Sequence, residues 1–243
     1  MTVLVIRRDD SFGQILRQAG LEVIDLELIE TKPLKDLSVL REKLSRLADY
    51  DGLFFTSPAA ANVFVSERKG TNGFHGNVYA LGRRAQNVLE TAGLDVRFVA
   101  DANTAEEMMA ALGESEFTAK RFLFVRGEMS VRTIPDVLQG KASIDEVAVY
   151  ETVPIDIDEG RVKNVKVRLA SGEIKWICFF SPSAVERFVE LFGDHANDVN
   201  AAAIGTTTAR SLTEAGFTVD YISPRSNADD FAGGLIEQIK SIE

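Results

Sequence analysis

Short apolar runs alternate with longer amphipathic stretches along the chain, and turn residues separate them. The runs have the length of buried strands, and the stretches carry apolar residues at helical spacing. This alternation is typical of βα units and predicts parallel sheets flanked by helices. The predicted strands are Val3–Ile6, Glu22–Leu26, Gly52–Phe55, Asn77–Leu81, Asp95–Phe98, Phe122–Val125, Trp176–Phe180, Ala202–Ile204 and Thr218–Ile222, with a helix at Phe12–Ala19.

Two further helices carry their own end signals. We predict helices over Arg84–Thr91 and Thr207–Glu214, and each is followed by an Ala-Gly pair. Gly93 and Gly216 suit the left-handed backbone that often follows the last turn of a helix.

A repeat relates the two halves of the chain. The segment "GRRAQNVLETAGLDVRFVADANTAEEMMAAL", which begins at Gly82, matches "GTTTARSLTEAGFTVDYISPRSNADDFAGGL", which begins at Gly205, at an offset of 205 − 82 = 123. Upstream, "FFTSPAAANVF" from Phe54 matches "CFFSPSAVERF" from Cys178 at an offset of 178 − 54 = 124. A period of domain size indicates a structural duplication rather than a solenoid.

Two alternating segments lie outside the repeat and end near prolines. They are Asp25–Leu34 and Glu146–Ile155, and an antiparallel pair of connecting strands would let the chain leave one lobe and return to it. This predicts an α/β fold of two similar lobes with parallel sheets flanked by helices, joined by a two-stranded antiparallel connector. The predicted limits are 36–146 for one lobe, 1–31 plus 155–243 for the other, and 27–35 and 147–154 for the connecting strands. Two tandem halves remain the alternative.

Composition narrows the function classes without naming one. The net charge of 27 − 37 = −10 argues against a general nucleic-acid binder. No apolar run approaches the roughly 20 residues that span a bilayer, so we expect no membrane partner. The single cysteine, Cys178, favours a reducing cytoplasm. His75 and His195 lack metal-ligand spacing, and we expect no metal.

The repeated Ser-Pro corners, at Ser57 and Ser181, have two explanations. Serine is a good N-cap and proline suits the first helical position, so the corners are typical of well-capped helices. Several polar corners, however, follow predicted parallel strands, and ligands bind outside the carboxyl ends of such strands. Facing lobes would then enclose a cleft for a polyanionic ligand. The candidate binding residues are Arg7, Thr56, Ser57, Gly82, Arg83, Arg126, Gly127, Ser181, Pro182, Ser183, Gly205, Thr206, Thr207 and Thr208.

The motifs resemble those of the uroporphyrinogen-III synthase family over essentially the whole chain. Their order and spacing are more specific than any one of them. They are "FTSP" at Phe55–Pro58, "LG" at Leu81–Gly82, "VRGE" at Val125–Glu128, "VYET" at Val149–Thr152, "FFSPSAV" at Phe179–Val185, "AIGTTTA" at Ala203–Ala209 and "ISP" at Ile222–Pro224.

The resemblance implies a bilobed fold and a cofactor-free reaction. Hydroxymethylbilane, a linear tetrapyrrole with carboxylates on each ring, would lose water to an azafulvene and close through a spiro intermediate, which inverts the terminal ring. Tyr150 matches the family's suspected catalytic tyrosine, with a structural tyrosine beside the connector as the alternative. Glu128 joins the binding set through "VRGE", and Thr208 matches a substrate-contacting threonine. Because the bilane closes without an enzyme, the protein's task is chiefly positional.

Two positions depart from the family pattern. Ala85 stands where the first copy of the Gly-x-x-Thr-Ala element would carry a hydroxyl, and Met129 stands where glycine is common. These departures keep a second interpretation open, a non-catalytic bilobed cytosolic binding protein for a polyanionic metabolite. We expect a monomer in either case.

Overall fold

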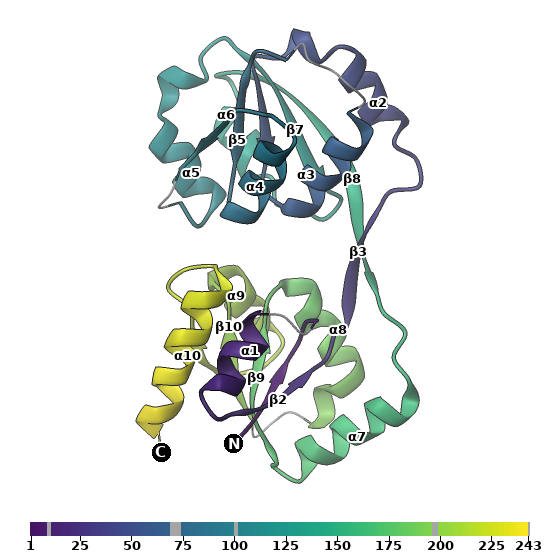
Figure 1. The fold of residues 1–243 in the computed structure, drawn as a ribbon, viewed down its shortest axis with the longest axis vertical. Coiled ribbons are helices and arrows are strands. Elements are labelled where there is room, and N and C mark those ends of the chain that lie inside the picture. The colour runs from purple at the N-terminus through teal and green to yellow at the C-terminus, as the bar shows by residue number, and fades with distance from the viewer. Residues whose placement is uncertain (9–10, 69–73, 100–101, 196–198, 243) are drawn as a thin grey trace. The chain divides into compact units, whose positions relative to one another are not determined.

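The computed structural model describes residues 1–8, 11–68, 74–99, 102–195 and 199–242. Contacts divide the chain into two units: a first unit of residues 1–30 and 153–243, and a second unit of residues 31–152. Both termini therefore belong to the first unit (Figure 1). The sequence-based limits of the two lobes as independently folded domains stay a prediction.

The first unit is built on a parallel sheet in the order β11-β10-β9-β1-β2. Helices cover both faces of this sheet. Successive side chains of a strand point to opposite faces, so neighbouring residues of one strand pack against different helices. Val3 and Val5 pack with α1 and α10, whereas Leu4 packs with the helices α7, α8 and α9 on the other face. The strands are β1 (Thr2–Val5), β2 (Glu22–Asp25), β9 (Ile174–Phe179), β10 (Asn200–Ala203) and β11 (Val219–Ile222). The helices are α1 (Ser11–Gln18), α7 (Glu159–Ala170), α8 (Pro182–Phe192), α9 (Thr206–Glu214) and α10 (Ala228–Ile242), with a 3₁₀ turn at Gly193–His195.

The second unit holds a sheet in the order β3-β8-β7-β4-β5-β6. Phe55 packs with α2, α3 and α4 on one face, and Phe54 packs with α5 and α6 on the other. The strands are β3 (Ile29–Pro33), β4 (Gly52–Phe55), β5 (Asn77–Ala80), β6 (Val96–Phe98), β7 (Arg121–Gly127) and β8 (Ser143–Pro154). The helices are α2 (Ser38–Ser45), α3 (Pro58–Glu67), α4 (Arg83–Thr91), α5 (Ala105–Leu112) and α6 (Thr133–Leu138), with 3₁₀ turns at Leu47–Asp49 and Glu114–Glu116.

The predicted α/β fold with parallel sheets flanked by helices is confirmed, and the repeat explains the strand orders. Order β6-β5-β4-β7-β8 in the second unit corresponds strand by strand to β11-β10-β9-β1-β2 in the first. The chain's first strands thus supply in one unit what β7 and β8 supply in the other. Several predicted strand limits were misplaced. Strand β10 begins at Asn200 and not at Ala202; its start was missed because Asn-Ala lacks the β-branched residues that mark strands. Residues 100–101 of the first repeat copy lie outside the described residues.

The two segments predicted as connecting strands pair with each other. Leu34 N donates to Val149 O at 3.0 Å, and Ile155 N donates to Leu28 O at 2.9 Å. From Leu28 to Leu34 the paired residue runs backward from Ile155 to Val149, so β3 and β8 are antiparallel, as predicted. β3 is the only antiparallel strand among the described strands of the second sheet.

Candidate functional site

In each unit, the predicted site residues lie together at the carboxyl edge of the sheet. This follows from parallel pairing, because the strands of each parallel set end at the same edge (Figure 1). The second unit brings together Thr56, Ser57, Gly82, Arg83, Arg126, Gly127, Glu128 and Tyr150. The first unit brings together Arg7, Ser181, Pro182, Ser183, Gly205, Thr206, Thr207 and Thr208. The predicted cleft between two facing edges stays a prediction.

Both edges contain a switch point of the strand order, where open α/β sheets bind ligands. In the second unit the chain moves from β4 outward to β6 and then returns to β7 on the other side of β4. In the first unit the switch lies between β1 and β9. Arg7 follows β1 there and places its guanidinium 4.3 Å from the centre of the Phe180 ring, which follows β9. The predicted residues therefore flank the expected binding point in each sheet.

The Ser-Pro corners act as helix caps. Ser57 Oγ accepts a hydrogen bond from Ala60 N at 3.1 Å, and Ser181 Oγ accepts one from Ala184 N at 3.3 Å. The prolines that follow occupy the first helical positions. Capping thus accounts for both serines as acceptors, while each hydroxyl keeps a proton that it can donate. Ser183 Oγ lies 3.4 Å from Ser181 Oγ at the second of these corners.

The glycine corners leave helix amides uncapped. Gly82 and Gly205 precede α4 and α9, and neither helix start has a side-chain cap. Gly82 has φ +81°, in the left-handed region that favours glycine. Gly205 is extended, but a Cβ there would lie 2.7 Å from Ser226 Oγ. Free N–H groups and the helix dipole make both starts suited to carboxylates.

Thr208 and Ala85 occupy equivalent positions of the repeat, and both side chains are buried. Thr208 is 3% exposed and Ala85 1%. The hydroxyl missing at Ala85 is therefore missing from a core-facing position of α4. Thr206 and Thr207 are exposed at the start of α9, in contrast to Thr208. Of the three threonines, these two offer the accessible hydroxyls.

The arginines at the second edge differ in how they are used. Arg126 Nη1 donates to the carbonyls of Gly127 and Glu128, both at 2.9 Å. Its Nε lies 2.9 Å from Glu146 Oε2, so the charge of Arg126 is compensated within the unit. Arg83 is exposed, with its guanidinium 5.4 Å from the centre of the Phe98 ring. Among the described residues no carboxylate pairs with Arg83, which leaves it available to an anionic ligand.

Tyr150 lies in β8 directly beside Gly127 of β7. The ring packs so closely on this glycine that a Cβ at residue 127 would lie 2.5 Å from Tyr150 Cζ and 2.8 Å from its phenolic oxygen. Within the described residues no group forms a hydrogen bond with that oxygen. The phenols of Tyr50 and Tyr79, by contrast, donate to Asp145 at 2.6 Å and to Glu116 at 2.5 Å. Tyr150 thus keeps a free donor at the site edge.

Sequence reasoning missed Glu146 and Ser130. Ser130 Oγ accepts a hydrogen bond from Gly127 N at 3.0 Å, which closes the turn after β7. Glu146 alternates with the buried Val147 in β8, and this alternation was the signal that its carboxylate faces away from that core. The side chain instead meets Arg126 and Arg132.

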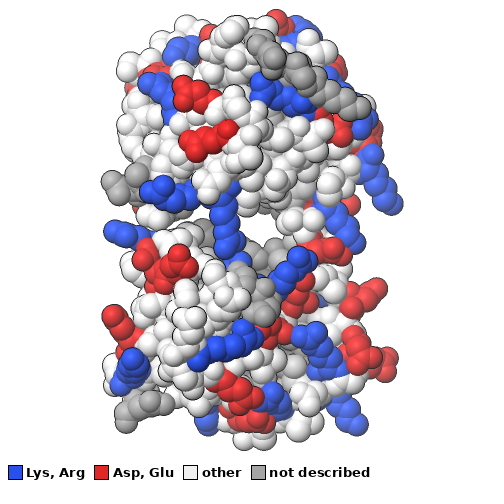
Figure 2. Space-filling model, viewed as in Figure 1, with Lys and Arg blue, Asp and Glu red and all other residues white. Residues whose placement is uncertain are grey.

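A pocket of about 380 Å³ adjoins Arg7 in the first unit. Its lining carries both signs of charge, including Arg8, Asp25, Glu27 and Arg161. Figure 2 likewise shows Lys and Arg interspersed with Asp and Glu over the drawn face of each unit. Within the described residues, no group of three or more His, Cys, Asp and Glu side chains could hold a metal ion. Likewise, none of the described helices combines the length and apolarity that a membrane crossing requires.

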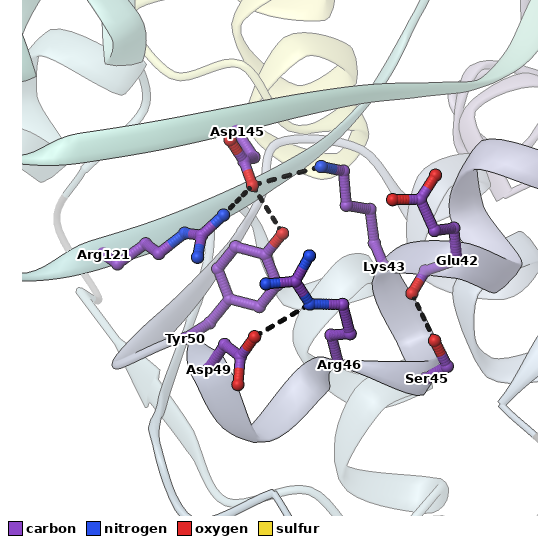
Figure 3. Close-up of polar contacts among 8 residues, drawn as sticks. All are labelled: Glu42, Lys43, Ser45, Arg46, Asp49, Tyr50, Arg121 and Asp145. Carbon is purple, nitrogen blue, oxygen red and sulfur yellow. Dashed lines mark hydrogen bonds and ion pairs between the residues drawn. The ribbon is translucent and has the colours of Figure 1, made fainter.

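A second polar cluster, centred on Asp145, lies at the amino edge of the second sheet (Figure 3). Asp145 Oδ2 accepts from Tyr50 Oη at 2.6 Å, Arg121 Nη2 at 2.9 Å and Lys43 Nζ at 3.2 Å. The Tyr50 hydrogen bond, followed by Arg121 and Lys43, lowers the pKa of Asp145 from 3.8 to about 2. The cluster ties α2 and the turn after it to β7 and β8, far along the strands from the carboxyl edge, and it is structural.

We expect Asp145→Asn to lower the free energy of unfolding at pH 7 by about 1 to 2 kcal/mol, a value discounted for partial exposure. Because the pKa of Asp145 is depressed in the folded state, the stabilisation is present above about pH 4 and is lost as pH falls toward 2. Urea unfolding at pH 7 and at pH 3 measures it. Asp49→Asn, in an exposed pair with Arg46, is the control and should change stability by less than about 0.5 kcal/mol. A wild-type advantage that stays constant across this pH range would contradict the role of Asp145.

Comparison with known proteins shows the family and the fold of this chain. The family model described as Uroporphyrinogen-III synthase HemD matches residues 10–233. The chain is 31% identical over 251 residues to a uroporphyrinogen-III synthase of Chlorobaculum parvum, covering 98% of this chain and 99% of that protein. Solved structures of the mutant Thermus thermophilus uroporphyrinogen III synthase (TM-score 0.64, 18% identity, 99% of both chains) and of the Helicobacter pylori uroporphyrinogen-III synthetase (TM-score 0.62, 17% identity, 100% of this chain and 99% of that one) share the fold.

Proposed function

The chain belongs to the uroporphyrinogen-III synthase family, and from this we propose that it cyclises hydroxymethylbilane to uroporphyrinogen III, with inversion of the terminal pyrrole ring and loss of water. The observation that carries the proposal is the family match over nearly the whole chain. The free Tyr150 phenol at an edge of uncapped amides and hydroxyls supports it.

We assign Tyr150 to the departure of the hydroxyl group. The phenol donates a hydrogen bond to the leaving oxygen as the carbon–oxygen bond breaks. The pyrrole nitrogen gives up its proton, so that the net loss is one water and the product of this step is the azafulvene. Holding the chain so that one particular ring carbon attacks is then a matter of position, for which the rigid strand ends are suited.

The substrate's carboxylates are assigned to the carboxyl edges of both sheets. The amides that begin α4 and α9, the hydroxyls of Thr206 and Thr207, and the guanidiniums of Arg7 and Arg83 are the proposed donors. Ser57, Ser181 and Ser183 add hydroxyl protons. Arg126 is assigned an indirect role: it holds the carbonyls of Gly127 and Glu128 in place and is not a free cation for the substrate.

The alternative, a binding protein without catalytic activity, loses one of its arguments. The hydroxyl missing at Ala85 is missing from a buried position, so its loss removes no accessible donor. We also propose that the protein is cytoplasmic, for which its single cysteine, the free and buried Cys178, is the supporting feature, and that it is a monomer.

An isomer assay tests the proposed function. Fresh hydroxymethylbilane is supplied, the products are oxidised, and type I and type III porphyrins are separated. We expect the type III isomer to dominate, with its share of the product rising as more protein is added. Type I alone at saturating protein would favour the binding protein.

Arg83→Ala should raise KM for the bilane by about threefold to tenfold and leave kcat nearly unchanged, because an exposed charge contributes to uniform binding. Initial rates at low and at high salt measure this, and screening should shrink the difference at high salt. Arg83→Lys keeps the charge and should recover most of the affinity. Arg46→Ala removes an exposed cation at the opposite sheet edge and should change neither constant; an equal effect there would reduce the result to overall charge.

A further inference from the structure

The turn at the end of β7, residues 127–132, is held in place by a set of hydrogen bonds and ion pairs. Arg126 Nη1 donates to two of its carbonyls, those of Gly127 and Glu128. Ser130 closes the turn, since Gly127 N donates to Ser130 Oγ at 3.0 Å and Ser130 N donates to Gly127 O at 3.2 Å. The side chains of Met129 and Val131, 90% and 67% exposed, contribute little packing to hold this turn.

Glu146 joins both ends of this turn. Its Oε2 lies 2.9 Å from Arg126 Nε before the turn, and its Oε1 lies 3.0 Å from Arg132 Nη1 at the turn's end. Only 19% of the Glu146 side chain is exposed, as is 20% of Arg126. The carboxylate of Glu146 therefore bridges a largely buried cation before the turn and an exposed one, Arg132, at its end.

The 127–132 turn also fixes the position of the Tyr150 ring. Gly127, its first residue, is the surface on which the ring lies, and Glu128 N donates to Tyr150 O at 3.0 Å. The strand register shifts between Arg126 and Gly127, and pairing resumes with Gly127 opposite Tyr150. The backbone thus places Gly127 beside the ring, and Arg126 with Glu146 hold the irregular segment on either side of it.

We propose that Glu146 is a positioning residue for the Tyr150 phenol, acting through Arg126, Arg132 and the turn 127–132. The inference rests on the proposed function only for its effect on rate. The physical claim, that the carboxylate of Glu146 determines the environment of the Tyr150 ring, stands separately and has its own measurement.

The test uses the full chain labelled with 3-fluorotyrosine. The chain has four tyrosines, each of which gives a ¹⁹F resonance, and the resonance that is lost in Tyr150→Phe belongs to Tyr150. Glu146→Gln should shift or broaden the Tyr150 resonance while those of Tyr50, Tyr79 and Tyr221 stay. It should also lower kcat by about tenfold with a smaller change in KM, as displacements of 1 Å or less do at catalytic groups. In a Tyr150→Phe background, Glu146→Gln should have little further effect on kcat.

The controls separate the outcomes. Asp136→Asn removes an exposed carboxylate 3.8 Å from Arg132 and should leave both spectrum and rate unchanged. Should Glu146→Gln fold poorly, Arg132→Gln removes one of the two ion pairs at a side chain that is 62% exposed and should shift the same resonance. An unmoved Tyr150 resonance in folded Glu146→Gln overturns the inference. A moved resonance with unchanged kcat upholds it and instead overturns the catalytic role proposed for the phenol.

Discussion

Tyr150→Phe should lower kcat for formation of the type III isomer by about 100-fold, at the lower end of what general acid assistance contributes. The change removes one oxygen and leaves the ring on Gly127. Because no described group bonds to that oxygen, no partner is left unsatisfied, and the free energy of unfolding should stay within about 0.5 kcal/mol of wild type. Steady-state kinetics with isomer separation, together with urea unfolding of the same preparations, measure both quantities.

Tyr50→Phe is the matched control, with the opposite expectation. Its hydroxyl donates to Asp145 at 2.6 Å, so its removal should lower stability by about 1 to 2 kcal/mol. Its cluster lies at the amino edge, and kcat should not change. Tyr150→Phe with unchanged turnover and isomer ratio would contradict the role assigned to the phenol, and the tyrosine would then be a packing residue of β8.

The repeat made the fold predictable from the sequence. Equal spacing of strand, corner and helix in two copies defines one parallel βα architecture twice, and it places the corners at the carboxyl edges without any coordinates. The corners at Ser57 and Ser181 were predicted together with their capping role, because N-cap preferences are local. Gly93 and Gly216 have φ +78° and +88°, in the left-handed region that often follows the last turn of a helix.

The use of individual charges was not predictable, since it depends on pairs that are distant in sequence. Arg126 looked like a ligand cation because it ends a strand, but its compensating carboxylate, Glu146, comes from the next strand. Thr208 looked like a ligand donor because of its motif, yet the helical phase turns it into the core. Local patterns specify where a residue lies along its element, whereas tertiary partners decide what remains free.

Gly127→Ala should lower kcat by about 30-fold to 100-fold by displacing the Tyr150 ring without altering its chemistry. The added methyl would lie 2.5 Å from Cζ and 2.7 Å from Cε2, well inside van der Waals contact, so the ring or β7 must shift. Overpacking of this kind costs about 1 to 3 kcal/mol of stability where neighbours cannot yield. Kinetics and urea unfolding measure the two effects, and the ¹⁹F resonance of Tyr150 should move.

Gly233→Ala provides the comparison, because a Cβ at this position of α10 meets nothing within 4 Å. There the same substitution should raise stability by about 0.5 to 1 kcal/mol, as glycine disfavours a helix interior, and should leave kcat unchanged. If position of the phenol is what matters, Gly127→Ala should add little to the loss already caused by Tyr150→Phe, since the displaced ring then has no hydroxyl to misplace. Fully multiplicative losses in the double variant would show instead that Gly127 acts on the substrate directly, through its own backbone, and that the contact with Tyr150 serves packing.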